Sequence, residues 1–279
     1  MKQYIHLLSN TGVGLPTDLW VPATNKVKPQ QSWQVAAGYA YDFTKYNLGF
    51  STELYYKEMN NIIGYKEGAS FIMIDNFTSA EEVDWQKNIT SGKGKSYGME
   101  LLLQRKTGKL SGWIGYTLSW TRHQFEELNY GESFWAKYDR RHDLSLVAIY
   151  NLNERITLSG VWVFGTGEAI TLPQSKFFDI PESYRPGMYF YSGLTDYGKR
   201  NDFRMKNYHR LDLCVQFHKN VRLGERIWEF GIYNAYARKN PFFYTLEEEY
   251  DRNTNQHKTV LKQVSLFPLV PSISYTLKF

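Results

Sequence analysis

The chain has 279 residues, 17% of them aromatic, yet its mean hydropathy is negative at −0.50, a combination that fits strands with one apolar and one polar face. No stretch approaches the roughly 18–20 consecutive apolar residues of a transmembrane helix, which excludes helical membrane spans but leaves β-barrels open. The net charge of +5 is dispersed over turns and loops, so we expect no nucleic-acid partner, and the single Cys214 permits no disulfide within the chain.

Alternating side chains begin after residues 9–30, whose Gly, Pro, Asn and Thr content predicts a loop. Over residues 33–43, and again over 48–56, nearly every second residue is apolar or aromatic. This two-residue period predicts two β-strands that form a hairpin with one apolar face. Residues 58–93 are then predicted to form a long loop.

The same alternation recurs in seven further segments. They are residues 97–104, 114–121, 144–150, 156–164, 211–217, 228–233 and 272–279. The connections alternate between turns of a few residues and long loops, the latter including residues 122–139, about forty residues before 211, and the stretch before the terminal strand. Short turns at one end and long loops at the other are typical of outer-membrane barrels, whereas a soluble sandwich has loops of mixed length at both ends.

One face of the predicted strands carries polar side chains that would be costly to bury in a packed soluble core. They are Glu53, Glu100, Asp212, Gln216 and Glu229. Aromatic side chains gather at both ends of the strands, as in the two interfacial girdles of a membrane barrel. Phe43, Tyr150 and Phe217 stand near the short turns, and Trp120, Phe164 and Tyr236 near the long loops.

We therefore predict a single domain over residues 1–279 with an all-β fold. The fold class is an antiparallel transmembrane β-barrel, represented by about nine strands with a polar lumen and a lipid-facing exterior. A soluble β-sandwich is the alternative, and it would require the apolar faces to pack against each other.

Several short motifs stand at strand starts and turns. They are KGKSYGME at residues 93–100, YDRRHDLS at 138–145, VWVFGTG at 161–167 with LP at 172–173, NAY at 234–236 with NPF at 240–242, and SYTLKF at 274–279. In this combination the chain resembles the barrel of TonB-dependent outer-membrane receptors of the Bacteroidetes type. The resemblance covers essentially the whole chain, and the combination is specific although each motif alone is weak.

The resemblance implies a receptor and transporter, not an enzyme, in the cell outer membrane. It would take up a scarce nutrient such as an iron chelate, cobalamin or an oligosaccharide, without a cofactor of its own. Its other partners would be outer-membrane lipid, the barrel-assembly machinery through the strand that ends at Phe279, and the TonB system through a plug domain.

The chain departs from that family in size. The family's barrels have about 22 strands and enclose a plug, whereas nine strands, no plug and no signal peptide are recognisable here. We therefore expect a fragment, the C-terminal portion of such a barrel. The alternative is a small complete outer-membrane barrel, porin-like or structural, in which residues 1–10 and 68–75 supply further strands.

Candidate ligand-binding residues lie in the loop before the seventh strand. They are Tyr184, Arg185, Tyr189, Tyr191, Tyr197 and Arg200. Tyr and Arg together suit anionic or aromatic ligands, because both stack and donate hydrogen bonds. An equally weighted interpretation is that this loop packs on its neighbours.

No catalytic or metal-binding residues are predicted. The isolated histidines form no Ser/His/Asp set, and His142 beside Asp143 is interpreted as part of a charged strand mouth. The acidic run Glu247–Glu249 with Asp251 is expected to be a solvated turn of an outer loop.

Overall fold

The structure, a computed structural model, describes residues 1–9, 18–66, 85–178, 193–222, 224–251 and 255–279. These residues form β-strands and connections, with three 3₁₀ turns, η1 (Thr44–Tyr46), η2 (Trp85–Asn88) and η3 (Asn129–Gly131). Within the described ranges, no helix is long and apolar enough to cross a bilayer.

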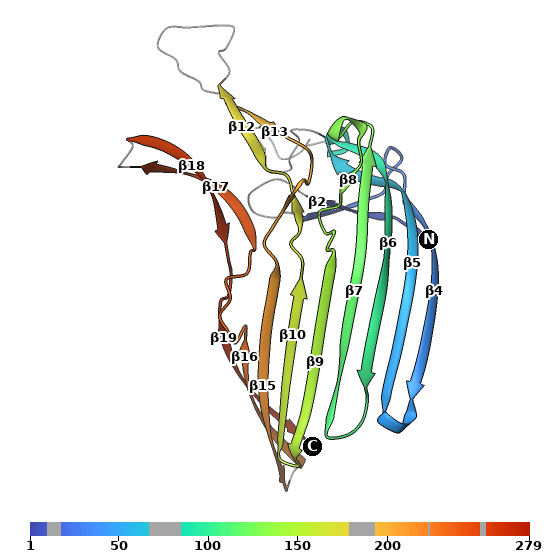
Figure 1. Cartoon of the computed structure of the whole chain (residues 1–279), viewed down its shortest axis with the longest axis vertical. Helices are drawn as coiled ribbons and strands as arrows, with labels where there is room; N and C mark the ends of the chain where they lie inside the picture. The colour runs from blue at the N-terminus through green and yellow to red at the C-terminus, as the bar shows by residue number, and fades with distance from the viewer. Residues whose placement is uncertain (10–17, 67–84, 179–192, 223, 252–254) are drawn as a thin grey trace.

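Nine long antiparallel strands form the main sheet, each paired with the next in chain order. They are β4 (Gln30–Phe43), β5 (Leu48–Tyr65), β6 (Ile89–Arg105), β7 (Leu110–Phe125), β9 (His142–Asn153), β10 (Ile156–Gly165), β15 (Tyr208–Val221), β16 (Gly224–Tyr233) and β19 (Val270–Lys278). All nine predicted strands are thus confirmed. Two short strands extend the sheet, β1 (Lys2–Gln3) beside β4 and β8 (Phe134–Trp135) beside β7. Figure 1 shows the long strands side by side as a curved wall, with the short turns at its lower end.

Several strands are longer than predicted. The ladder between β5 and β6 continues to Tyr65 opposite Ile89, so much of the predicted loop 58–93 is strand. Likewise β7 runs into the predicted polar loop 122–139 and ends at Phe125, which is buried. The upper parts of β5 and β6 carry charged residues such as Lys57 and Lys95, and therefore lack the hydrophobic alternation that marks a half-buried strand.

The predicted loops also contain small hairpins and short strand pairs. These are β2 (Ile5–Ser9) with β3 (Asp18–Pro22), β11 (Ala169–Ile170) with β14 (Phe203–Arg204), β12 (Pro173–Phe178) with β13 (Gly193–Tyr197), and β17 (Phe243–Asp251) with β18 (Gln256–Val264). The acidic run is therefore part of strand β17 and not a turn. Lys262 of β18 lies 2.6 Å from Glu247 and 2.7 Å from Glu249, and this cross-strand pairing offsets the repulsion between the two carboxylates.

The register of the wall separates its side chains onto two faces. Directly opposed residues share a face, because side chains in a strand alternate from one side to the other. Glu53 is opposite Glu100, and Gln216 is opposite Glu229 and donates a 2.6 Å hydrogen bond to it. We call the side that carries these groups the polar face, and it agrees with the predicted lumen-facing set.

The other side, the apolar face, carries large hydrophobic side chains from all nine strands. Members that are strongly exposed include Trp33, Val35, Tyr39, Leu54, Tyr97, Ile114, Tyr150, Leu158, Leu213, Phe217, Trp228, Phe230, Ile273 and Tyr275. No second layer of the described chain covers them. The inter-sheet packing that a soluble sandwich requires is therefore absent from the described part of the chain.

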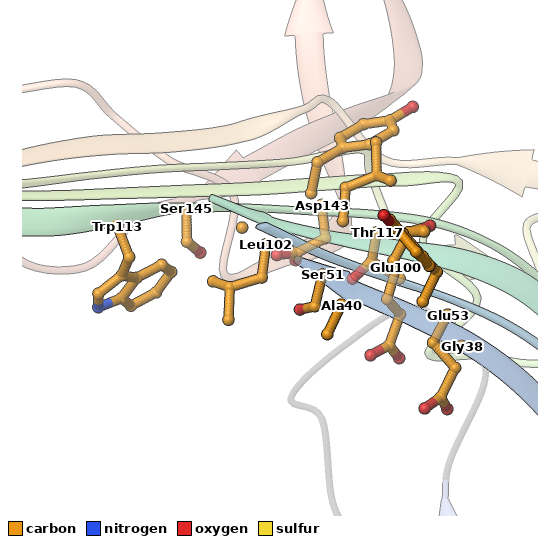
Figure 2. A pocket seen from close by; sticks show the side chains of 15 residues that line it. Gly38, Ala40, Ser51, Glu53, Glu100, Leu102, Trp113, Thr117, Asp143 and Ser145 are labelled. Carbon is orange, nitrogen blue, oxygen red and sulfur yellow. The ribbon is translucent and has the colours of Figure 1, made fainter. Parts of the chain in front are cut away.

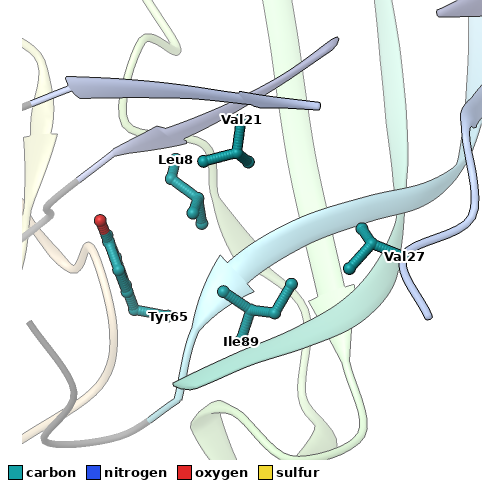
Figure 3. Packing of buried hydrophobic residues seen from close by; sticks show 5 residues of the cluster. All are labelled: Leu8, Val21, Val27, Tyr65 and Ile89. Atoms are coloured by element: carbon teal, nitrogen blue, oxygen red, sulfur yellow. The ribbon is translucent and has the colours of Figure 1, made fainter. Parts of the chain in front are cut away.

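Both clusters of buried hydrophobic residues lie at the long-loop end, in a region that we call the cap. One joins β2 and β3 to the ends of β5 and β6 and contains Leu8, Val21, Val27, Tyr65 and Ile89 (Figure 3). The second contains Ile62, Phe125, Leu128 and Phe134. The cap therefore folds around its own small core, whereas the described residues of the long strands below it form no such cluster.

Candidate functional site

A hollow of about 520 Å³ lies on the polar face where β4, β5, β6, β7 and β9 adjoin. The polar-face residues that line it are Gly38, Ala40, Ser51, Glu53, Glu100, Leu102, Trp113, Thr117, Asp143 and Ser145. Figure 2 shows the carboxylates of Glu53 and Glu100 projecting to the same side of the strands. Small residues such as Gly38, Ala40 and Ser51 leave the space that the larger neighbours border.

An acidic row crosses this hollow at one level. Glu53 is opposite Glu100, Glu100 is opposite Thr117, and Thr117 is opposite Asp143. Adjacent strands are about 4.8 Å apart, so these side chains lie close together. Their three carboxylates make the row a negatively charged surface of hydrogen-bond acceptors. No group of three or more His, Cys, Asp or Glu side chains among the described residues is arranged to hold a metal ion. The row is suited to water, to hydrogen-bond donors and to cationic groups.

A second polar network lies on the same face near the long-loop end. Arg210 Nε donates to Asp212 Oδ2 at 2.9 Å, and Nη1 donates to the hydroxyls of Tyr208 at 2.8 Å and Tyr233 at 2.7 Å. The guanidinium also stacks 4.1 Å from the Tyr233 ring centroid. Asp212 in turn accepts a 2.9 Å hydrogen bond from the Asn234 backbone N–H. The alternation in the sequence predicts Asp212 and Tyr233 on this face, whereas Tyr208 and Arg210 lie before the predicted strand 211–217 and were missed, although the same two-residue period extends to them.

Residues of the YDRRHDLS motif (138–145) form contacts that join the cap to the wall. The carboxylate of Asp139 is fully buried, accepts a 2.6 Å hydrogen bond from the Thr121 backbone N–H, and forms ion pairs with Arg141 and Arg204. The Arg141 guanidinium lies 4.6 Å from the Trp120 ring centroid and 4.7 Å from that of Trp135. A buried carboxylate needs such paired donors, because an uncompensated charge in the interior is costly.

His142 and the nearby Arg140 also form a hydrogen bond and an ion pair with other parts of the chain. His142 Nδ1 lies 2.8 Å from the Tyr116 hydroxyl, and Arg140 pairs with Glu168 at 3.0 Å. These contacts agree with the predicted charged strand mouth.

The structure describes two of the six predicted ligand-binding residues. Tyr197 ends β13 and is 46% exposed, whereas the Arg200 guanidinium stacks 5.5 Å from the Phe134 ring centroid and its backbone N–H donates to Asn129 Oδ1 at 2.9 Å. Arg200 therefore contacts the cap, and a ligand contact from Tyr197 or Arg200 stays a prediction. Tyr184, Arg185, Tyr189 and Tyr191 lie outside the described residues, so a ligand site there stays a prediction.

Comparisons with known proteins give only distant similarity. No family model matches the chain, and no curated protein matches its sequence. The ferripyoverdine receptor of the outer membrane of Pseudomonas aeruginosa is 12% identical, with 77% of this chain and 24% of the receptor covered and a TM-score of 0.48. The FrpB iron transporter from Neisseria meningitidis is 13% identical, with 78% and 29% covered and a TM-score of 0.47. The chain thus spans about a quarter of the length of the solved structures that it matches.

Proposed function

We propose that the chain forms part of the wall of a β-barrel in the cell outer membrane. The observation that carries the proposal is the exposed apolar face, which is continuous over nine strands and opposite a polar face. Soluble monomers rarely expose contiguous apolar patches of more than a few hundred Å², and exposed large hydrophobic side chains on all nine strands are not expected of one. In a bilayer the same side chains would contact acyl chains, while the polar face would line water.

The strand lengths support this proposal. At about 3.3 Å per residue and a tilt of about 40°, the 14-residue β15 crosses roughly 35 Å, which exceeds the hydrocarbon core of about 30 Å. The 10-residue β10 crosses about 25 Å, the height of the lipid-facing band in such barrels.

The direction of the edge strands favours a large barrel over a small complete one. Successive antiparallel pairing makes the first and ninth long strands, β4 and β19, run the same way. Direct closure between them would be parallel, unlike every other ladder in the sheet, and no such ladder occurs among the described residues. In lipid both edges need hydrogen-bonding partners. The porin-like alternative would therefore need another strand between them.

As a working function we propose a receptor that imports a scarce nutrient, such as an iron chelate, cobalamin or an oligosaccharide. The motif resemblance supports this part, with ligand contacts expected from the loop that holds Tyr184 to Arg200. The side chain of Phe279 is 99% exposed, which suits recognition by the barrel-assembly machinery. Energised import would further require a plug that engages the TonB system.

Neighbouring residues of β15 provide a direct test of the wall. Cys214, the single cysteine, belongs to the polar face, and Leu213 belongs to the apolar face and is 46% exposed. After reconstitution in vesicles, a water-soluble maleimide should label Cys214, whereas the double variant Leu213→Cys with Cys214→Ser should resist that reagent and react with a lipid-soluble maleimide. Equal labelling of both thiols by the water-soluble reagent would sink the proposal.

A further inference from the structure

Basic residues are concentrated at the end of the wall where the short turns lie. We call residues 42–49, 105–110, 151–156, 218–222, 224–226 and 276–279 the short-turn rim. It contains nine Lys or Arg residues and three Asp or Glu residues, a net charge of +6, whereas the whole chain has +5. The basic residues are Lys45, Arg105, Lys106, Lys109, Arg155, Lys219, Arg222, Arg226 and Lys278. The rest of the chain is therefore nearly neutral, and the rim carries the charge.

Three of these cations belong to the apolar face. Arg105 is opposite Leu48, Lys219 is opposite Arg226, and Arg226 is opposite Leu277. On this face Lys219 of β15 is next to Phe217, and Arg226 of β16 is next to Trp228, with each cation on the rim side of the aromatic residue. On these two strands the order from the middle of the wall to the rim is therefore aliphatic, aromatic and cationic, which is the order of a bilayer from acyl chains to headgroups.

The pairing of Lys219 with Arg226 is unfavourable without a partner. Like charges directly opposite each other on one face of a sheet repel. No described carboxylate forms an ion pair with Lys219, Arg226 or Arg105, and the buried Nε of Arg226 has no hydrogen-bond partner. The nearest acidic side chain in the sequence, Glu225, is already paired with His218 at 2.8 Å and Lys278 at 3.4 Å.

We propose that the short-turn rim binds the phosphate headgroups of anionic phospholipids in the adjoining leaflet. Lys219 and Arg226 would share one headgroup, which removes their repulsion. Arg105 would contact a second headgroup further along the rim. The proposal rests on the proposed function, because the rim reaches headgroups only if the apolar face lies in a bilayer.

The experiment uses the full chain in vesicles and measures quenching of tryptophan fluorescence by brominated lipids. Trp228 lies two residues from Arg226 and is 40% exposed, and a Trp228→Phe variant identifies its share of the signal. Brominated phosphatidylglycerol and brominated phosphatidylcholine are compared at equal mole fraction in a phosphatidylcholine bilayer. We expect association with phosphatidylglycerol to be stronger by about fivefold or more at low salt, and the preference to decline as salt is added.

The double variant Lys219→Gln with Arg226→Gln should lose this preference. Its matched control, Lys66→Gln with Lys95→Gln, removes two charges at the long-loop end, where the two lysines pair with Glu127 and Glu58, and should retain it. Equal quenching by both lipids in the native chain would overturn the lipid site and leave the membrane wall intact. The absence of quenching by either lipid would overturn the membrane wall and the lipid site together.

Discussion

Phe125 and Phe230 are chemically identical side chains that lie in two different environments. In the cap, Phe125 is 3% exposed and packs among Ile62, Leu128 and Phe134. On the wall, Phe230 is 42% exposed, and its ring neighbours, Phe217 and Trp228, belong to the same face. The cap packs its apolar side chains against each other, whereas the wall exposes its apolar side chains to whatever surrounds the protein. One chain thus combines a region that buries its apolar side chains with a region that exposes them, and under the proposed function lipid covers the second region.

The same substitution at both positions should give the largest contrast. Phe125→Ala removes a buried ring and leaves a cavity, so we expect it to lower the free energy of opening of the cap by about 3–5 kcal/mol. Phe230→Ala should lower the stability of the wall in lipid by only about 1 kcal/mol, because acyl chains refill the space. Hydrogen exchange at the Ile62 and Leu128 amides measures the first effect, and urea unfolding in vesicles measures the second. Comparable losses would remove the distinction between cap and wall.

An arginine placed on either face of the wall should show which of the two faces contacts lipid. Leu213→Arg puts a guanidinium on the apolar face near mid-strand, with an expected cost of about 2–4 kcal/mol in a bilayer. Ser274→Arg puts the same group on the polar face beside Glu229 and should change stability by no more than about 0.5 kcal/mol. The measurement is urea unfolding in phosphatidylcholine vesicles, followed by tryptophan fluorescence. If the two costs are equal, the apolar face does not contact lipid.

The smallest expected effect concerns the pH dependence of the cap. His6 on β2 is 1% exposed, and neither of its ring nitrogens forms a hydrogen bond. Burial lowers the pKa of His6 below its ordinary value of 6.5, against a weaker opposing effect of the Lys28 backbone. The unfolded hairpin therefore binds more protons than the docked one, so docking of β2–β3 is complete above about pH 6.5 and weakens as the pH falls below it.

Protection factors of the Leu8 and Val21 amides, measured between pH 7.5 and 3, test this expectation. They should decrease with acidification in the native chain and stay level in a His6→Gln variant. A second contact of the same hairpin, between Asp18 and the residues Tyr138 and Lys137, responds to pH in a lower range. Burial alone would raise the pKa of Asp18, but hydrogen bonds from Tyr138 and Lys137 outweigh it and hold the pKa below its ordinary value of 3.8. A loss of protection that begins only below pH 4 would therefore assign the transition to Asp18 and not to His6.

The candidate site was only partly accessible to sequence analysis. Glu53 and Glu100 were assigned to one face by their alternation, and the register then brings them directly opposite each other. The interactions of Asp139 with Arg204, 65 residues away, and of Arg200 with Phe134 had no such signal. Contacts between residues far apart in the chain leave no local pattern, so the interpretation of Arg200 as a ligand-binding residue could not be weighed against packing.

The sequence alone predicts the nine long strands, the face on which the residues of the predicted segments lie, and the end at which the turns are short. These features follow from a two-residue period and from connection length, which are local properties of the chain. The ends of β5 to β7, the packing of the cap and the β17–β18 hairpin depend on contacts between segments far apart in the chain or across a sheet, and they became visible in the structure alone. Those segments extend beyond the apolar band, where charged residues such as Glu247 and Lys262 replace the alternation and pairing across the sheet determines the structure.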